Sequence, residues 1–333
     1  MRFFLYNWSM KKQEITNENK SFLVTAYDGG AVFTAAILLS LFLSLVLGVV
    51  LIAAGKSYDE EFLSGNLYAF IAFALSPVAL CSVLVYAIRR RNLSLKYSAG
   101  FVPFDKKYIV IVALLLIGGV TGLSSLNTLF TDALNGALGY KATAISVPEG
   151  NFGFFALDVV LICALPAFFE ETLFRGLIFN GMKRLGDSFC VLYGGALFAL
   201  FHHSPVQTVY QFILGVTFCL LALKSGSVYP SMIFHFANNF IVLAAYFIFG
   251  ESAALPVWVE IIVTVLGVAA FALGLFLLIG CEKPEREREL KEKYLQIVTA
   301  GEERKSFLLS SAIGVLACVA IWVSELIVGI KGA

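Results

Sequence analysis

The 333-residue chain is 59% hydrophobic and 14% charged, and its formal net charge is +1. A soluble globular domain carries about 25% charged residues, so this composition excludes a soluble protein. It predicts a polytopic membrane protein, which crosses the lipid bilayer several times and has lipid as a direct partner. The near-neutral net charge gives no reason to expect a nucleic-acid partner.

Apolar runs predict an all-α bundle of about nine transmembrane helices. A helix that crosses a bilayer needs about 20 apolar residues. Runs of this kind lie at roughly 30–54, 65–88, 108–131, 152–180, 188–203, 205–224, 228–250, 256–280 and 306–330. The fourth run is long for a single span and the fifth is short.

Lysine and arginine predict the orientation of the bundle. With nine spans and a cytoplasmic N-terminus, 20 of the 24 basic residues fall in cytoplasmic segments, and only Lys56, Lys141 and Lys331 fall outside. The remaining basic residue, Arg175, lies inside a span. Positive charge collects on the cytoplasmic side of membrane proteins. One span more or fewer would destroy this asymmetry, so we expect the N-terminus inside and the C-terminus outside.

Glu170, Glu171 and Arg175 form the first of three polar clusters in apolar spans, where charged groups are rare unless they pair or take part in chemistry. Residues four apart share a helix face, so Glu171 and Arg175 are expected to pair. Glu170 has no such intrahelical partner. A carboxylate that is unpaired in a low-dielectric site binds a proton more readily than one in water, which suits Glu170 to take a proton from water. The alternative is a structural ion-pair network between helices.

His202 carries the second cluster, at the end of the apolar run that contains Phe198. Pro205 follows and breaks the helix or starts the next one. A lone histidine at a helix end is more often a packing or capping residue than a catalytic one, so the interpretation of His202 depends on what lies near it.

The third cluster is His235 with Asn239, which are four residues apart inside the run 228–250 and therefore share a face. A buried pair of this kind can donate hydrogen bonds to a developing oxyanion. The alternative is that the two side chains form hydrogen bonds that hold neighbouring helices together. The adjacent Asn238 lies on another face of the same helix.

Helix geometry brings the three clusters to one depth. Glu171 and His202 each lie about 15 residues from the turn near Gly186, or ~22 Å along antiparallel helices at 1.5 Å per residue. His235 and Asn239 lie about 9 and 13 residues beyond the next turn on the same side, or ~13 and ~20 Å from it. This agreement favours a catalytic centre over three separate structural features.

The ordered set Glu-Glu-x-x-x-Arg, Phe-x-x-x-His and His-x-x-x-Asn in membrane spans resembles the CAAX-protease and bacteriocin-processing family, also called the Abi or type II CAAX prenyl endopeptidase family. The resemblance covers about residues 150–245. Each motif is weak alone, whereas the ordered set is specific. The matching positions are Glu170, Glu171 and Arg175; Phe198 and His202; and His235 and Asn239. His203 and Asn238 fall outside the motif positions and receive no role.

The resemblance implies intramembrane proteolysis and a role for each motif residue. Glu170 and His202 are expected to activate the attacking water, and His235 and Asn239 to stabilise the oxyanion. Arg175 is expected to hold Glu171.

The family has also been described as metal-dependent. Two histidines and a carboxylate can bind zinc, in which case the ligands here would be Glu170, His202 and His235. The chain has no His-Glu-x-x-His motif, and the mechanism inferred from the residues needs neither a metal nor another cofactor. We therefore favour a glutamate-dependent, metal-free reaction.

The resemblance divides the chain into a core and flanking parts. We expect a cytoplasmic segment 1–29 without a cleavable signal peptide, three accessory helices in 30–131, a catalytic core in 150–250, and two further helices in 251–333. Acidic and basic residues alternate in the loop 281–305, which predicts a solvated cytoplasmic helix. The six cysteines are scattered without a CxxC pair, so we expect no disulfide framework.

The leading hypothesis is an intramembrane endopeptidase, expected in a prokaryotic cell membrane, that acts on a membrane-associated peptide or protein. A prenylated C-terminal motif, a leader peptide and a regulatory membrane protein are alternative substrates, and the oligomeric state is left open. Two rival functions remain: a proton-coupled transporter that uses the same acids and histidines as a relay, and a non-catalytic scaffold of the same family. The absence of internal repeats argues against the transporter.

Overall fold

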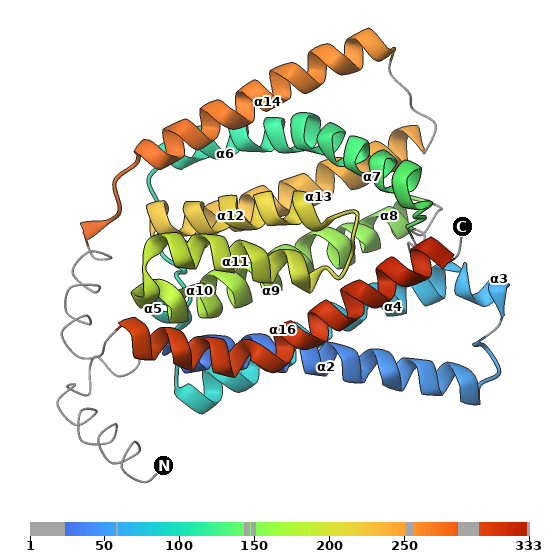
Figure 1. Cartoon of the computed structure of the whole chain (residues 1–333), viewed down its shortest axis with the longest axis horizontal. Coiled ribbons are helices and arrows are strands. Elements are labelled where there is room, and N and C mark those ends of the chain that lie inside the picture. Colours follow the sequence, from blue (N-terminus) through green and yellow to red (C-terminus); the bar gives the residue numbers. More distant parts are fainter. Residues whose placement is uncertain are drawn as a thin grey trace.

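The computed structural model describes residues 24–57, 59–142, 147, 151–250, 256–285 and 300–331, and the secondary structure of these residues is entirely helical (Figure 1). This confirms the predicted all-α bundle. Residues 1–23 of the predicted N-terminal segment 1–29, and residues 286–299 of the charged loop, lie outside the described residues, whereas residues 26–29 belong to the first helix.

Three long helices and two short ones make up the first part of the bundle. The long ones are α2 (Ala26–Ala53), α4 (Asn66–Arg91) and a continuous helix made of α6 (Lys107–Gly118), the π-helical η2 (Gly119–Leu123) and α7 (Ser124–Leu138); the short ones are α3 (Glu60–Leu63) and α5 (Leu95–Ser98). Helix α2 begins at a capping box, in which the Thr25 hydroxyl accepts from the Asp28 N–H and the Asp28 carboxylate accepts from the Thr25 N–H.

The second part begins with a helix that runs without a break from Phe152 to Leu185 but changes its winding. Its segments are α8 (Phe152–Asp158), the π-helical η3 (Val159–Ala164), α9 (Leu165–Glu171), the π-helical η4 (Thr172–Ile178), α10 (Phe179–Met182) and the 3₁₀ turn η5 (Lys183–Leu185). Five helices follow: α11 (Asp187–Phe201), α12 (Thr208–Ser225), α13 (Tyr229–Phe249), α14 (Val257–Gly280) and α16 (Ala300–Lys331). Short π-helical segments occur frequently at functional sites.

All nine predicted helices are present, but one is too short to span a bilayer. Eight helices in the described residues are long and apolar enough to cross a membrane. The fifth helix, α11, has only 15 residues. Its hairpin with α12 ends short of the end of the bundle that α7 and α8 reach (Figure 1). The hairpin of α11 and α12 begins and ends on the same side of the bundle. Helix α13 therefore starts on the predicted side whether or not α11 crosses the whole bilayer.

The helices lie roughly parallel in a bundle, and α9, α11 and α13, the helices on or beside which the polar motifs lie, run through its middle (Figure 1). Helix α2 packs along α16 on one flank, α14 packs along α6 and η2 on the other, and α9, α11, α12 and α13 lie between them. Large apolar side chains on the outer faces, such as Leu45, Phe276 and Leu316, are exposed. Such surfaces require lipid around the bundle, because monomeric soluble proteins rarely expose large contiguous apolar patches.

Glycines allow α11 and α12 to approach closely. A Cβ atom on Gly195 would lie 2.9 Å from the Val216 nitrogen, and one on Gly215 would lie 2.9 Å from the Gly195 Cα. Small residues at a crossing point let membrane helices pack backbone to backbone. This contact sets the position of the Gly215 carbonyl, which belongs to the candidate site.

Basic side chains gather at one end of the bundle, which we call the basic end. Arg91, at the end of α4, pairs with Asp28 at the start of α2. Lys283, after α14, pairs with Asp187 at the start of α11. The Lys224 ammonium also donates to carbonyl groups at the end of α14. This grouping agrees with the charge asymmetry of the sequence.

We expect the basic end to face the cytoplasm, as the positive-inside rule predicts. The test uses a variant without native cysteines that carries either Glu61→Cys near α3 or Glu285→Cys at the basic end. A membrane-impermeant maleimide should label the first in intact cells and the second only after permeabilisation. The opposite pattern would overturn the orientation.

Replacing Gly195 by alanine should destabilise the bundle, because the new methyl group forces α11 away from α12. We expect a loss of about 1–3 kcal/mol in unfolding free energy, typical of overpacking. Thermal unfolding in detergent measures the effect. Gly136→Ala is the matched control, since nothing lies within 4 Å of a Cβ there. Equal stability of the two variants would contradict the close crossing.

Candidate active site

A buried ion pair lies at the junction of α9 and η4. The Arg175 guanidinium meets the Glu171 carboxylate through Nη1 and Oε1 at 3.0 Å, and neither side chain is exposed. This is the pair that the four-residue spacing predicts. A buried pair offsets its desolvation cost best when its other hydrogen-bonding groups are also satisfied. The second guanidinium nitrogen, Nη2, donates to the Gly215 carbonyl on α12 at 3.2 Å, whereas Arg175 Nε and Glu171 Oε2 have no hydrogen-bond partner among the described residues.

Three aromatic rings surround the Arg175 guanidinium. Its Cζ atom lies 4.3 Å from the ring centre of Phe198, 4.9 Å from that of Phe218 and 5.7 Å from that of Phe174. A guanidinium within about 6 Å of a ring centre is attracted to the negative face of the ring. The rings stabilise the buried cation without adding another charge. They also keep the surroundings of the ion pair apolar.

His235 on α13 binds the same carboxylate oxygen. Its Nδ1 lies 3.0 Å from Oε1 of Glu171, and the histidine is 5% exposed. A carboxylate accepts only, so Nδ1 carries the hydrogen and the Nε2 atom is left for other interactions. The His235 ring also stacks on Phe218 at a centroid distance of 5.6 Å. Glu171 thus connects α9 to α13 and fixes the orientation of the imidazole.

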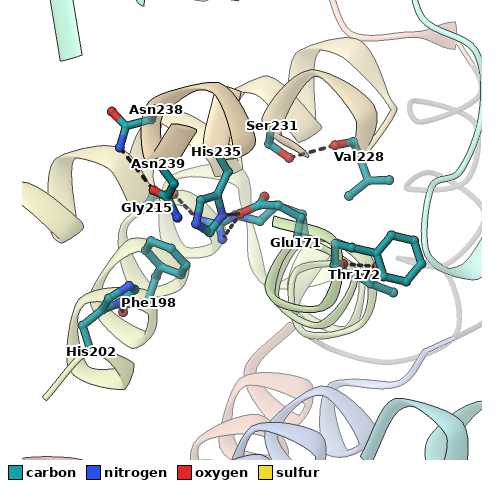
Figure 2. Close-up of polar contacts among 12 residues, drawn as sticks. Glu171, Thr172, Phe198, His202, Gly215, Val228, Ser231, His235, Asn238 and Asn239 are labelled. Carbon is teal, nitrogen blue, oxygen red and sulfur yellow. Dashed lines mark hydrogen bonds and ion pairs between the residues drawn. The ribbon is translucent and has the colours of Figure 1, made fainter. Parts of the chain in front are cut away.

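His202 lies on the other side of Phe198 from His235. The Phe198 ring contacts both imidazoles edge to face, and its centroid lies 4.7 Å from that of His202 and 6.0 Å from that of His235. Figure 2 shows the Phe198 ring between the two imidazoles. His202 caps α11, and its Nδ1 lies 2.8 Å from the Phe198 carbonyl. Because a carbonyl only accepts, Nδ1 donates and Nε2 of the neutral ring carries a lone pair.

Glu170 is buried beside this network without being bonded to it. The residue is 7% exposed, so it faces the protein interior and not lipid. Its Oε2 atom has no hydrogen-bond partner among the described residues. The carboxyl group interacts electrostatically with His235, Glu171 and Arg175. An unpartnered buried carboxyl is costly, and such groups occur at functional sites where a ligand or water completes the arrangement.

Asn239 makes its contacts one turn beyond His235. Its Nδ2 donates to the Ile162 carbonyl in η3 at 3.0 Å. The neighbouring Asn238 faces α12, where its Oδ1 accepts from the Tyr210 hydroxyl at 2.9 Å. Asn238 also donates from Nδ2 to Oδ1 of Asn239 at 3.4 Å. His235 and Asn239 therefore both face the helix that carries Glu170, as their shared face predicts.

The conditional metal ligands do not converge in this arrangement. Among the residues that the structure describes, no three His, Cys, Asp or Glu side chains form a cluster able to hold a metal ion. Within the predicted set of Glu170, His202 and His235, each imidazole directs Nδ1 to a protein acceptor, so only Nε2 could bind a metal. The Phe198 ring lies between the two imidazoles and separates them. These three residues as placed do not fit a zinc ion.

Several groups around the motif residues were not identified from the sequence. They are Gly215, Phe218, Tyr210 and the Ile162 carbonyl. The sequence did indicate that Arg175 needs a further acceptor. A buried guanidinium has five N–H donors, and Glu171 cannot accept hydrogen bonds from all of them. The sequence does not identify which carbonyl of which helix provides this acceptor, because this depends on the α11–α12 crossing.

Residues 152–241, about a quarter of the chain, match a family model described as type II CAAX prenyl endopeptidase Rce1-like. The matched segment runs from the start of α8 into α13 and contains every motif residue named above. It confirms the resemblance to the CAAX-protease family. No curated protein and no solved structure matches the chain.

Replacing Arg175 by methionine should unfold the core or weaken it by about 3–5 kcal/mol, because it leaves the Glu171 carboxylate buried without its cation. Thermal unfolding in detergent checks this. Lys107→Met is the matched control: the pair that Lys107 forms with Asp105 is exposed, so its loss should cost less than about 1 kcal/mol.

A second variant separates the ion pair from the packing of the arginine side chain. Combining Arg175→Met with Glu171→Gln removes both charges, so the double variant should be more stable than Arg175→Met alone. If the double variant loses as much stability as the sum of the two single variants, the two groups do not interact as described.

Proposed function

We propose that this chain, whose residues 152–241 match a type II CAAX prenyl endopeptidase family model, is an intramembrane endopeptidase of that family that hydrolyses a peptide bond with activated water. One observation carries the proposal. The buried side chain of Glu170 has a carboxyl oxygen with no hydrogen-bond partner among the described residues, and Glu170 is next in sequence to Glu171, which forms a charged network with Arg175 and His235. A bundle that needed only stability would gain more from apolar side chains at these positions.

Glu170 and His202 are the groups we assign to water activation. Glu170 has a carboxyl oxygen that no described residue binds, which leaves it available to a water molecule. His202 directs Nδ1 to a backbone carbonyl, so the lone pair on Nε2 is free to accept a hydrogen bond or a proton. A water that both groups hold would lose its proton as it attacks the substrate carbonyl.

His235 and Asn239 are the groups we assign to the oxyanion. Both are on α13 and face the helix that carries Glu170. Glu171 binds Nδ1 of His235 and fixes the direction of the ring, so Nε2 can donate to the oxyanion when it also carries a hydrogen. Asn239 has a second amide hydrogen beyond the one given to Ile162. Donors fixed in place before the reaction stabilise developing negative charge.

Phe198 and Phe218 keep this chemistry in apolar surroundings. They cover the Arg175 guanidinium and contact His235. Hydrogen bonds and charges act more strongly when water is excluded from around them. The two rings therefore raise the effect of the charged network on a bound peptide.

The substrate we propose is a peptide or protein segment that reaches the site from within the bilayer or its surface. The site lies near the centre of the bundle, among helices of spanning length. A substrate must enter that depth, which favours membrane-associated chains over soluble ones. We place the protein in a prokaryotic cell membrane, with its basic end toward the cytoplasm.

Replacing Glu170 by glutamine should abolish cleavage while leaving the fold intact. Mass spectrometry of membrane fractions would compare cells that carry the wild-type chain with cells that carry Glu170→Gln. We expect at least one membrane-associated precursor to accumulate uncleaved in the variant, with its shortened product lost by about 100-fold or more.

Glu260→Gln is the matched control, because Glu260 is exposed near the start of α14 and lies outside the site. It should leave the cleavage pattern unchanged. Identical membrane peptides in wild-type and Glu170→Gln cells would rule out a peptidase. Proton flux through reconstituted vesicles that Glu170→Gln stops would instead support the transporter, and an unchanged phenotype would support the scaffold.

A further inference from the structure

Asn239 belongs to a chain of hydrogen bonds whose other members lie outside the three motifs. The Tyr210 hydroxyl on α12 donates to Oδ1 of Asn238 at 2.9 Å. Nδ2 of Asn238 donates to Oδ1 of Asn239 at 3.4 Å. Nδ2 of Asn239 donates to the Ile162 carbonyl at 3.0 Å. The chain thus crosses from α12 through α13 to η3.

A proline four residues later removes the donor that an α-helix would direct to the Ile162 carbonyl. In an α-helix this carbonyl would accept from the N–H of residue 166, but residue 166 is Pro166, which has no N–H. The winding changes at this point, where the π-helical η3 ends at Ala164 and α9 begins with Pro166 in its first turn. The side-chain amide of Asn239 donates to the Ile162 carbonyl in place of the missing N–H of residue 166.

The hydrogen bond to the Ile162 carbonyl, at one end of this series of hydrogen bonds, determines which way the Asn239 amide points. A backbone carbonyl only accepts, so the NH₂ group of Asn239 must face Ile162 and its Oδ1 must face Asn238. Asn238 then directs its own NH₂ group to Asn239 and its Oδ1 to the Tyr210 hydroxyl. An unconstrained asparagine amide can rotate by 180°, which would exchange a donor for an acceptor. Here one Asn239 N–H is held by Ile162 and the other has a fixed direction.

We propose that Tyr210, Asn238 and Pro166 are positioning residues that hold the Asn239 amide with one N–H directed toward the substrate oxyanion. This rests on the proposed function, since it assumes that Asn239 acts there. Tyr210 and Asn238 act through Oδ1 of Asn239, whereas Pro166 acts because it has no N–H to compete with Asn239 for the Ile162 carbonyl. A donor is useful to a transition state only when its direction is fixed beforehand, because reorientation during the reaction costs free energy.

The proposal predicts that three chemically different changes have one effect. Tyr210→Phe removes only the hydroxyl that binds Asn238. Asn238→Asp keeps the acceptor for Tyr210 but removes the donor to Asn239. Pro166→Ala restores a backbone N–H that competes with Asn239 for the Ile162 carbonyl. Each change should loosen the Asn239 amide while the motif residues stay intact.

The first measurement follows the amide itself and needs no substrate. The protein is labelled with [¹⁵N]asparagine, placed in lipid nanodiscs, and its side-chain amide signals are recorded by NMR. The Asn239 signal is the one lost in Asn239→Ala. It should shift or broaden in Tyr210→Phe and Pro166→Ala. It should stay unchanged in Tyr86→Phe, since Tyr86 is 63% exposed on α4, and in Pro256→Ala, since Pro256 is exposed at the start of α14.

The second measurement follows turnover of the precursor that accumulates with Glu170→Gln, in pulse–chase experiments at several expression levels of that precursor. The three variants should slow maximal turnover by about 10- to 100-fold, the range expected when a reacting group is displaced by about 1 Å. The precursor level that gives half-maximal turnover should stay within about twofold of wild type, because ground-state binding does not use the oxyanion donor. The two control variants should match wild type.

The outcomes separate this proposal from the proposed function. An unchanged Asn239 signal in Tyr210→Phe and Pro166→Ala overturns the positioning role, whatever the activity. Wild-type turnover in these variants, together with a loss in Asn239→Ala, overturns it as well. If Glu170→Gln accumulates no precursor, the endopeptidase fails, and an Asn239 signal that still moves in the variants shows an amide held for a purpose other than proteolysis.

Discussion

The buried carboxylate of Glu171 is the interaction on which the rest of the site depends. One of its oxygens, Oε1, accepts hydrogen bonds from both Arg175 and His235. A charge of this kind in an apolar interior costs several kcal/mol unless opposite charge and hydrogen bonds surround it. The need to satisfy it brings α9, α13 and, through the Arg175–Gly215 bond, α12 to one place. The helices are thus joined by polar contacts at the depth where hydrophobic burial cannot select a partner, because lipid is equally apolar.

Irregular backbone is the second feature that shapes the site. The helix that carries Glu170 changes its winding on both sides of α9, at η3 and at η4. In η3 the Ile162 carbonyl accepts from the side chain of Asn239 on α13, so this irregular turn takes part in the contact between the two helices. In a membrane, unsatisfied backbone groups are tolerated only inside the protein, so these irregular turns lie where other helices cover them. The aromatic rings of Phe198 and Phe218 add to this enclosure and place an apolar surface against Arg175 and His235.

Much of this arrangement was predictable from the sequence, and the remainder depends on how the helices cross. The apolar runs predicted the helices because bilayer thickness fixes their length, and the spacing of Glu171 and Arg175 predicted their ion pair because a helix has a fixed period. The length of α11 was less well defined, since the run 188–203 ends in two histidines and a turn. Two features depend on the close contact of Gly195 with Gly215, which no local sequence pattern predicts. They are the position of Phe198 between the imidazoles and the hydrogen bond from Arg175 to Gly215. Pro166 was visible in the sequence, but its consequence required knowing that Asn239 lies opposite Ile162.

Hydrolysis of a peptide bond leaves a chemical mark that tests the central claim most directly. The purified protein would be reconstituted with membrane proteins from cells that lack it, in water enriched in ¹⁸O, and new carboxyl termini would be sequenced by mass spectrometry. The account predicts ¹⁸O in the new termini with the wild-type chain and none with Glu170→Gln, because the attacking water supplies one carboxylate oxygen. If the wild-type chain produces no ¹⁸O-labelled termini, or if Glu170→Gln produces as many, the buried network does not serve peptide hydrolysis.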